Sequence, residues 1–410
     1  MDDRHLRALI GERHPASSPT ALRQTEGYLT EQFKDLGLDV SAHPFKALGD
    51  TYRNVIGTRP ASHPSSGSGA PLIVAAHYDT VPGSPGADDN ASALAVLLEA
   101  ARCLQGVPLS REVRFIAFSL EEENLLGSLA YASSLKEDGH EIEGAIVLEC
   151  VGYASAAEGS QQKPAGVPIV VPTVGDFLAI VGNTASAALV AAAEGAARQR
   201  VPDLKTVALM VPGNGELVPD TRRSDHAAFW HYGYPAVMLT DTANFRNPNY
   251  HASTDTIETL DVGFMEKVAR ALTATVIPGQ EIDVFGSGFP ADADVLLVIE
   301  RNGADAGSQT LRTDSTGSFS AMIDAGPGRG GVYTLIATSG SAKAVAEALA
   351  VETAGAGGTG GRQSPPPTDE APNVPVRDAP ANPTLPIVAV LVSLLIAAAY
   401  LRRRATPGVS

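Results

Sequence analysis

Short apolar runs alternate with helix-length stretches between residues 71 and 276, and this alternation constrains the fold more than any other feature of the sequence. The runs have the length of buried strands and are, in chain order, PLIVAAHYDT, REVRFIAFSL, GAIVLEC, DFLAIVGN, TVALMV and YPAVMLTD. The stretches between them have helical spacing and include NASALAVLLEAARCLQ, LLGSLAYASSLKE, residues 185–199 and the closing MEKVARALTATV. Strands separated by helices pair in parallel, so the sequence predicts an α/β domain with a mixed, mostly parallel sheet and helices on both faces.

The segments before residue 71 and after residue 276 have different sequence patterns. Ahead of it, LRQTEGYLTEQFKDLGLDV repeats apolar positions at helical spacing and stops at Gly37, and residues 61–69 form a loop rich in Ser, Gly and Pro. After Val276, short alternating segments separated by Gly, Asp and Ser indicate a small immunoglobulin-like β-sandwich. We therefore expect an α/β domain over residues 1–276 and a sandwich over residues 277–353.

The composition of residues 354–410 predicts a linker followed by a membrane anchor. Residues 354–384 are rich in Gly and then in Pro, which is typical of a semi-extended linker. Residues 385–401 carry no charge and are just long enough for a transmembrane helix. The arginines within residues 402–410 mark this tail as cytoplasmic and place the preceding domains outside the membrane.

The first residues, MDDRHLRALIGERH, contain no apolar segment of the kind that directs secretion. An extracellular position of the large domain therefore requires an export signal ahead of Met1. The alternative is a tail-anchored protein whose large domain faces the cytoplasm. Because that alternative puts the arginines on the far side of the membrane, the charge pattern favours export.

Charge and cysteine content exclude other classes of protein. The formal net charge is −16, and there is no basic stripe to neutralise phosphates, which argues against a nucleic-acid partner. The two cysteines, Cys103 and Cys150, lie outside any CxxC or Cys/His zinc pattern. We expect both to be buried free thiols.

Acidic and histidine side chains follow the carboxyl ends of the predicted strands. In chain order they are His77, Asp79, Asp88, Asp89, Glu121, Glu122, Glu123, Glu149 and His251. Taken singly, each motif has a simpler explanation: an Asp pair caps a helix, and a run of glutamates is solvated. Taken together they can converge, because ligands of α/β sheets collect at the carboxyl ends of the strands.

Two imidazoles with several carboxylates form a ligand set that suits zinc. Five ligands are too many for one tetrahedral ion that keeps an open position. They suit two ions if one carboxylate bridges them, and a remaining carboxylate beside the metals can then act as a general base.

The order of these motifs resembles that of metallopeptidase family 28, the di-zinc aminopeptidases and their carboxypeptidase relatives. The segments that carry the resemblance are HYDTVPGSPGADDNAS, SLEEENLLGS, LECVGY, SDHAAF and YHASTDT, within about residues 1–275. The resemblance implies the zinc exopeptidase fold, two Zn²⁺ ions and a peptide or protein substrate.

The resemblance also implies the metal ligands. His77 and Glu149 would hold the first zinc, Glu122 and His251 would hold the second, and Asp89 rather than its neighbour would bridge them. Many relatives carry Asp at the position of Glu149, which makes this ligand the least standard member of the set.

Further roles follow from the same resemblance. Glu121 matches the general base, Asp79 the carboxylate that orients His77, and Tyr250 a tyrosine that helps to hold the oxyanion. Arg223 could contact substrate. Asp225 and His226 could support the site, and Glu123 has no assigned role and is expected to be exposed.

The sequence leaves several functions open. An aminopeptidase is expected, and the alternative of the same fold is a carboxypeptidase or dipeptidase in which Arg223 captures a carboxylate. A glutaminyl cyclase uses a single zinc, so the complete two-metal set argues against it. A catalytically inactive receptor or adhesin would be expected to have lost ligands, and the oligomeric state is not predicted.

Overall fold

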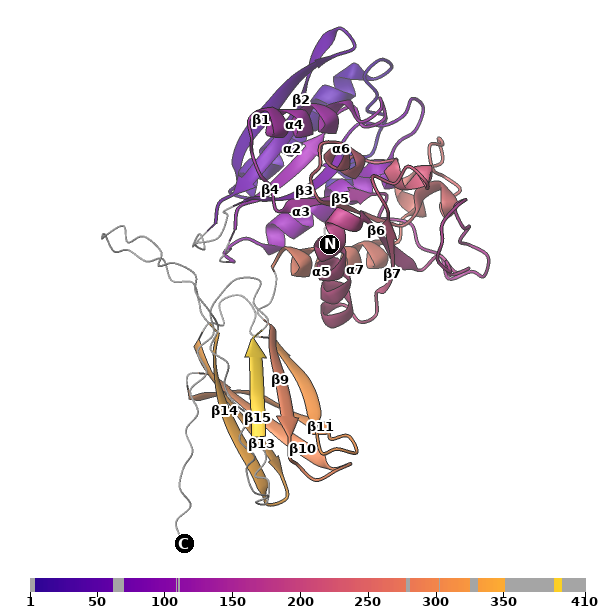
Figure 1. Cartoon of the computed structure of the whole chain (residues 1–410). Coiled ribbons are helices and arrows are strands. Elements are labelled where there is room, and N and C mark those ends of the chain that lie inside the picture. Colours follow the sequence, from indigo (N-terminus) through magenta and orange to yellow (C-terminus); the bar gives the residue numbers. More distant parts are fainter. Residues whose placement is uncertain are drawn as a thin grey trace, which may run out of the picture. The chain divides into compact units, whose positions relative to one another are not determined.

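The computed structural model describes residues 4–61, 70–107, 109, 111–277, 281–301, 303–324, 331–350 and 387–392. The chain divides into two compact units, Met1–Pro278 and Gly279–Ser410. The first unit is an α/β structure and the second is built from strands (Figure 1).

The first unit contains an eight-stranded mixed sheet. Its strands, in sheet order, are β1 (Asp39–Ala47), β2 (Asp50–Arg59), β4 (Val113–Phe118), β3 (Leu72–His77), β5 (Gly144–Glu149), β8 (Ala236–Thr240), β6 (Phe177–Asn183) and β7 (Lys205–Val211). The central run β4-β3-β5-β8 is parallel throughout, as is the β6–β7 pair. The β1–β2, β2–β4 and β8–β6 pairs are antiparallel. The predicted mixed sheet is therefore confirmed.

Helices cover both faces of this sheet, as the sequence predicted. One face packs against α1 (Arg4–Leu9), α2 (Pro19–Asp35), α3 (Ala93–Cys103), α5 (Ala187–Arg200) and α7 (Val262–Val276). The other face packs against α4 (Leu126–Glu137) and α6 (His226–His231). Strand β3 contributes to the hydrophobic core on each face of the sheet. Leu72 and Val74 pack on the face covered by α1, α2, α3, α5 and α7, and Ile73 and Ala75 pack on the face covered by α4 and α6. Since side chains alternate across a strand, a strand buried on both faces is apolar at every position.

The parallel central strands bring their carboxyl ends to one edge of the sheet. His77 is the last residue of β3 and pairs with Phe118, the last residue of β4. Glu149 is the last residue of β5 and pairs with Thr240, the last residue of β8. The loops that leave these four ends therefore share one region.

The second unit has two antiparallel sheets around one core. The larger sheet has the order β11 (Ala304–Arg312), β10 (Asp294–Arg301), β13 (Gly331–Ser339) and β14 (Ala342–Ala350). The smaller has the order β12 (Phe319–Asp324), β9 (Glu281–Ser287) and β15 (Ile387–Val392). Val284, Val295 and Leu335 are fully buried in the core. Each short segment predicted after Val276 is thus a strand, and the immunoglobulin-like topology stays a prediction.

The predicted membrane segment at residues 385–401 lies mostly outside the described residues, as do the linker and the tail at residues 402–410. Its described part, Ile387–Val392, is strand β15, which pairs antiparallel with β9, where a helix was expected. Within the described parts of the chain, no helix combines the length and the apolar character that a bilayer crossing requires. The membrane anchor stays a prediction.

The two cysteines differ in environment. Cys150 is buried, as expected, but Cys103 is exposed, so the expectation of two buried thiols was wrong for Cys103. It ends the amphipathic helix α3 beside Arg102, on the face that points to solvent.

Candidate metal centre

The predicted metal ligands converge at the carboxyl edge of the sheet. His77 and Glu149 end neighbouring strands, and Glu122 lies in the turn after β4. Asp89 lies in a short π-helical turn, η1 (Ala87–Ser92), and His251 in a loop after β8. Ligand atoms of His77, Asp89 and Glu149 lie within 4.8 Å of one another, and so do those of Asp89, Glu122 and His251.

The carboxylate of Asp89 belongs to both groups. Its Oδ1 lies 3.2 Å from Nε2 of His77, and its Oδ2 lies 3.0 Å from Nε2 of His251. Glu149 Oε2 lies 3.4 Å from the first imidazole nitrogen, and Glu122 Oε2 lies 3.3 Å from the second. The two oxygens of Asp89 therefore face two different imidazoles, each of which also has a glutamate carboxylate beside it.

Unpartnered polar atoms test whether these residues suit a metal. Nε2 of His77, Oδ1 of Asp89 and Oε1 of Glu122 are buried and form no hydrogen bond with the described residues. A buried polar atom left without a partner costs about 1–3 kcal/mol, and three of the ten such atoms found among the described residues gather at this centre. Imidazole nitrogens and carboxylate oxygens are ligands that zinc accepts, and the set therefore fits zinc.

Electrostatics at the centre also favour a cation. Burial lowers the pKa of His251, but hydrogen bonds to Asp89 and Glu122 outweigh it and raise that pKa to about 10. In the same way, Glu121 and Glu149 overcome burial and raise the pKa of His77 well above its usual value. The carboxylates thus stabilise positive charge on both imidazoles, and a metal competes with protons for the same nitrogens.

Glu121 lies beside the two groups that share Asp89. Its Oε2 is 3.9 Å from Nε2 of His77, and its side chain is buried. Burial raises the pKa of Glu121 well above its usual range, and Glu149 and Glu122 add to this, against the opposing effect of His77. A carboxyl group with a raised pKa next to a metal position suits proton transfer near neutral pH.

Asp79 contacts both His77 and the glutamate pair. Its Oδ1 lies 3.6 Å from Nδ1 of His77, and its backbone carbonyl oxygen lies closer to the same nitrogen, at 3.2 Å. The same carboxylate accepts the backbone N–H of Glu121 at 3.0 Å and that of Glu122 at 3.1 Å. The second contact was not predicted, and it fixes the turn that carries the pair.

Both carboxylate oxygens of Asp88 accept hydrogen bonds from other groups of the protein. Its Oδ1 accepts the N–H of Gly152 at 2.8 Å and the hydroxyl of Ser92 at 3.2 Å, and its Oδ2 accepts the amide of Asn247 at 2.7 Å. Asp88 also belongs to none of the groups of candidate ligand atoms among the described residues, so it does not share the metal-facing position of Asp89.

Sequence reasoning missed three supporting residues. Asp255 accepts the N–H groups of Asp88 at 2.9 Å and Asp89 at 3.2 Å, which holds the turn η1, and burial raises its pKa to about 7. Ser224 donates to Glu149 Oε2 at 2.8 Å, and the thiol of Cys150 donates to Oε1 at 3.3 Å. Ser224 and Asp255 lie inside the motifs SDHAAF and YHASTDT, but the motifs do not reveal their partners.

The remaining predicted residues lie at the mouth of the site or behind it. The ring of Tyr250 stacks on His251 with centroids 3.9 Å apart, and its hydroxyl accepts from Arg223 Nη2 at 3.3 Å. Arg223 is 42% exposed and also donates to Asn244 at 2.8 Å. Asp225 and His226 are fully buried at the start of α6, where burial raises the pKa of Asp225 to about 7.

Comparison with known proteins places the chain in a family. Residues 54–276 match the model described as peptidase family M28. YfbL of Escherichia coli (strain K12), an uncharacterized protein, is 32% identical over 283 residues, which cover 65% of this chain and 84% of YfbL. The chain belongs to peptidase family M28. The predicted family and the predicted class of enzyme, a peptidase, are thereby confirmed.

Two further relatives match over smaller shares of their own length. Aminopeptidase YwaD of Bacillus subtilis (strain 168) is 40% identical over 119 residues, 28% of this chain and 24% of YwaD. The structure of LapB from Legionella pneumophila matches with a TM-score of 0.52 at 20% identity, covering 67% of this chain and 69% of LapB. At that identity the likeness shows the fold alone. Family membership supports a zinc-dependent metallo-exopeptidase whose substrates are peptides.

Proposed function

We propose that this M28 protein is a two-zinc aminopeptidase in which Glu121 is the general base. The observation that supports this most is the carboxylate of Asp89, whose two oxygens face two different imidazoles. His77 and Glu149 would complete one metal position, and Glu122 and His251 the other. Zinc bound there would polarise the scissile carbonyl and lower the pKa of a water molecule.

The protein groups around these positions would carry the proton and hold the substrate. Glu121 would accept the proton of the attacking water and return it to the leaving amine. Asp79 would keep the Glu121 turn in place through the N–H groups that it binds. The hydroxyl of Tyr250 would donate to the carbonyl oxygen as negative charge develops on it.

An apolar pocket beside the centre supports a side-chain preference. The cavity has a volume of about 100 Å³, and its lining includes Glu149, Arg223 and Tyr250. Its wall is mostly aliphatic and aromatic, with the side chains of Ile169, Phe177, Val181, Leu209 and Met238. Such a wall favours an apolar side chain at the substrate residue next to the scissile bond.

Metal analysis tests the centre itself. We expect about two zinc ions per chain, and we expect chelation to lower the melting temperature. A metal present at about 100 times its Kd stabilises the folded state by about 2.7 kcal/mol, which is several degrees for a domain of this size. Magnesium is the control, because an imidazole-containing set disfavours it. Unchanged metal content and an unchanged melting temperature after chelation would contradict the proposal.

A substrate panel tests the aminopeptidase assignment. Leucyl and phenylalanyl substrates should be cleaved at least about tenfold faster than alanyl ones, because each methylene in an apolar pocket contributes about 1–3 kcal/mol. N-acetylated versions should resist, and amidation of the C-terminus should leave the rate unchanged. The reverse result would favour the carboxypeptidase alternative, since it would show that Arg223 or a similar group captures a carboxylate.

A further inference from the structure

We infer that Arg13 is a positioning residue of the metal centre, and that its buried guanidinium ties the loop after β3 to the turn that carries Asp89. Arg13 lies upstream of residues 54–276, which the family model matches, and no sequence motif drew attention to it. The inference rests on the proposed two-zinc site, because that site is what Arg13 would position.

The guanidinium of Arg13 is enclosed by backbone carbonyls. The side chain is only 1% exposed. Its Nε donates to the carbonyl of Tyr78 at 2.8 Å, and Nη1 and Nη2 donate to those of Pro85 and Gly86, each at 3.1 Å. Nη1 also donates to the carbonyls of Leu9 and Gly11 in its own segment. One cation therefore joins three segments of the chain.

Two of these segments carry metal ligands. Tyr78 directly follows His77, and Gly86 comes three residues before Asp89. The backbone N–H of Arg13 adds a hydrogen bond to the hydroxyl of Thr80 at 2.9 Å, within the same loop. The separation between the positions of His77 and Asp89 thus depends on a side chain that touches neither.

Glycine at position 86 makes room for this arrangement. Gly86 has φ +61°, and a Cβ there would lie 2.8 Å from Nη2 of Arg13 and 2.4 Å from the methyl of Thr80. Only a residue without a side chain allows the guanidinium and the Thr80 side chain to approach the backbone this closely.

Arg13 supplies positive charge without using the metal-facing oxygens. Burial lowers its pKa to about 10, opposed by Asp79, Asp89, Asp255 and Glu122, so the group stays charged near neutral pH. The hydrogen bonds described for its guanidinium go to carbonyl oxygens, which leaves the nearby carboxylates available for metal. A cation behind the ligands offsets part of the repulsion among them.

His14, the residue after Arg13, contacts a third loop of the centre, the one that carries Glu121 and Glu122. His14 Nε2 lies 3.2 Å from Oε1 of Glu123, which follows Glu121 and Glu122 directly. Glu123 is therefore half-buried and paired, where an exposed side chain was expected.

Substitution of Arg13 tests the inference. Arg13→Lys keeps the charge but loses the planar fork that spans two loops, and Arg13→Met loses both. We expect each variant to bind zinc about 10- to 100-fold more weakly in competition with a chelator. At zinc saturation kcat should fall while KM changes little, with Arg13→Lys the milder of the two.

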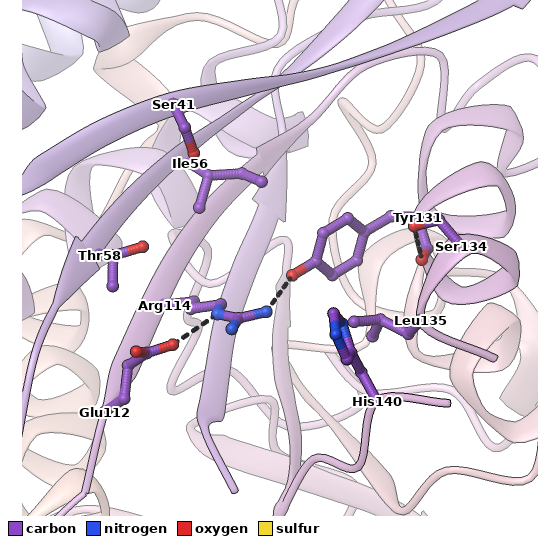
Figure 2. A pocket seen from close by; sticks show the side chains of 9 residues that line it. All are labelled: Ser41, Ile56, Thr58, Glu112, Arg114, Tyr131, Ser134, Leu135 and His140. Carbon is purple, nitrogen blue, oxygen red and sulfur yellow. Dashed lines mark hydrogen bonds and ion pairs between the residues drawn. The ribbon is translucent and has the colours of Figure 1, made fainter. Parts of the chain in front are cut away.

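Arg114→Met is the matched control. The guanidinium of Arg114 likewise joins two groups, here the side chains of Glu112 at 2.7 Å and Tyr131 at 3.2 Å, in a cavity of about 320 Å³ (Figure 2). That cavity lies near the start of β4, whereas Glu121 follows its end. We expect this variant to lose stability towards urea but to keep its zinc affinity and kcat.

Three results distinguish a positioning role of Arg13 from a purely structural role and from failure of the proposed function. Wild-type zinc affinity and kcat in Arg13→Lys would overturn the inference, even if that variant were less stable, because a purely structural arginine predicts this pattern. If Arg13→Met does not fold, Arg13→Lys decides alone. A wild-type protein that binds no zinc would overturn the proposed function, and the role of Arg13 would fall with it.

Discussion

Glu121→Gln is expected to lower kcat by on the order of 10²–10⁴-fold while zinc stays bound. The amide has nearly the same size and shape as the carboxyl group, but it cannot accept a proton from water. The ligand atoms of Glu121 also lie within 4.8 Å of those of His77 and Glu122, but each of the two groups that include Asp89 keeps three ligands without Glu121. A loss of 10³-fold corresponds to about 4 kcal/mol of transition-state stabilisation.

Steady-state kinetics with metal content measured on the same samples would check this. KM should change little, since the substrate contacts remain. Glu122→Gln is the matched comparison and should show the opposite pattern, with weaker zinc binding first, because Glu122 Oε2 lies 3.3 Å from His251 Nε2. Full turnover in Glu121→Gln with two zinc ions verified would remove Glu121 from the role of base.

The fold was predictable where burial leaves a clear pattern. The central strands β3 and β5 are buried on both faces, so their sequences are apolar up to their last residue, and β4 departs from this only at Arg114. The segment at residues 387–392 shows the limit of this reasoning. An apolar run without charges has no periodicity that separates a helix from a buried strand, and here the structure forms β15.

The candidate ligands were predictable because most of them directly end or follow a strand. Their supports were not, because those contacts join distant parts of the chain. Asp255 binds the N–H of Asp88 across 167 residues, and Ser224 reaches Glu149 across 75. Arg13 escaped notice for a further reason: arginine is mostly found at the surface, and nothing local marks a buried one.

Glu149 illustrates how the structure changes a reading of the sequence. Many relatives carry Asp at this position, so the geometry of the longer Glu149 side chain could not be predicted from the sequence. In the structure one of its oxygens accepts from Ser224 and the other from the thiol of Cys150. Donors on both oxygens restrict the carboxylate plane, so the extra methylene does not leave the ligand free to turn away from His77.

Asp89→Asn is expected to disrupt both metal positions at once. The amide offers one oxygen in place of two, and its NH₂ group would face either His77 or His251, whose nitrogens must be free to bind metal. Partners that only support a ligand contribute about 10- to 100-fold to metal affinity, so loss of a shared ligand should exceed 100-fold for at least one ion. Turnover should fall with the metal content and should not return when excess zinc is supplied.

Asp88→Asn separates this effect from damage to the turn η1. Asp88 is equally buried, but its oxygens bind Gly152, Ser92 and Asn247 rather than facing an imidazole. Its substitution should therefore lower the free energy of unfolding while two zinc ions remain bound at saturation. Equal zinc loss in the two variants would mean that the turn, and not the carboxylate of Asp89, determines metal binding, and the bridging role would then be wrong.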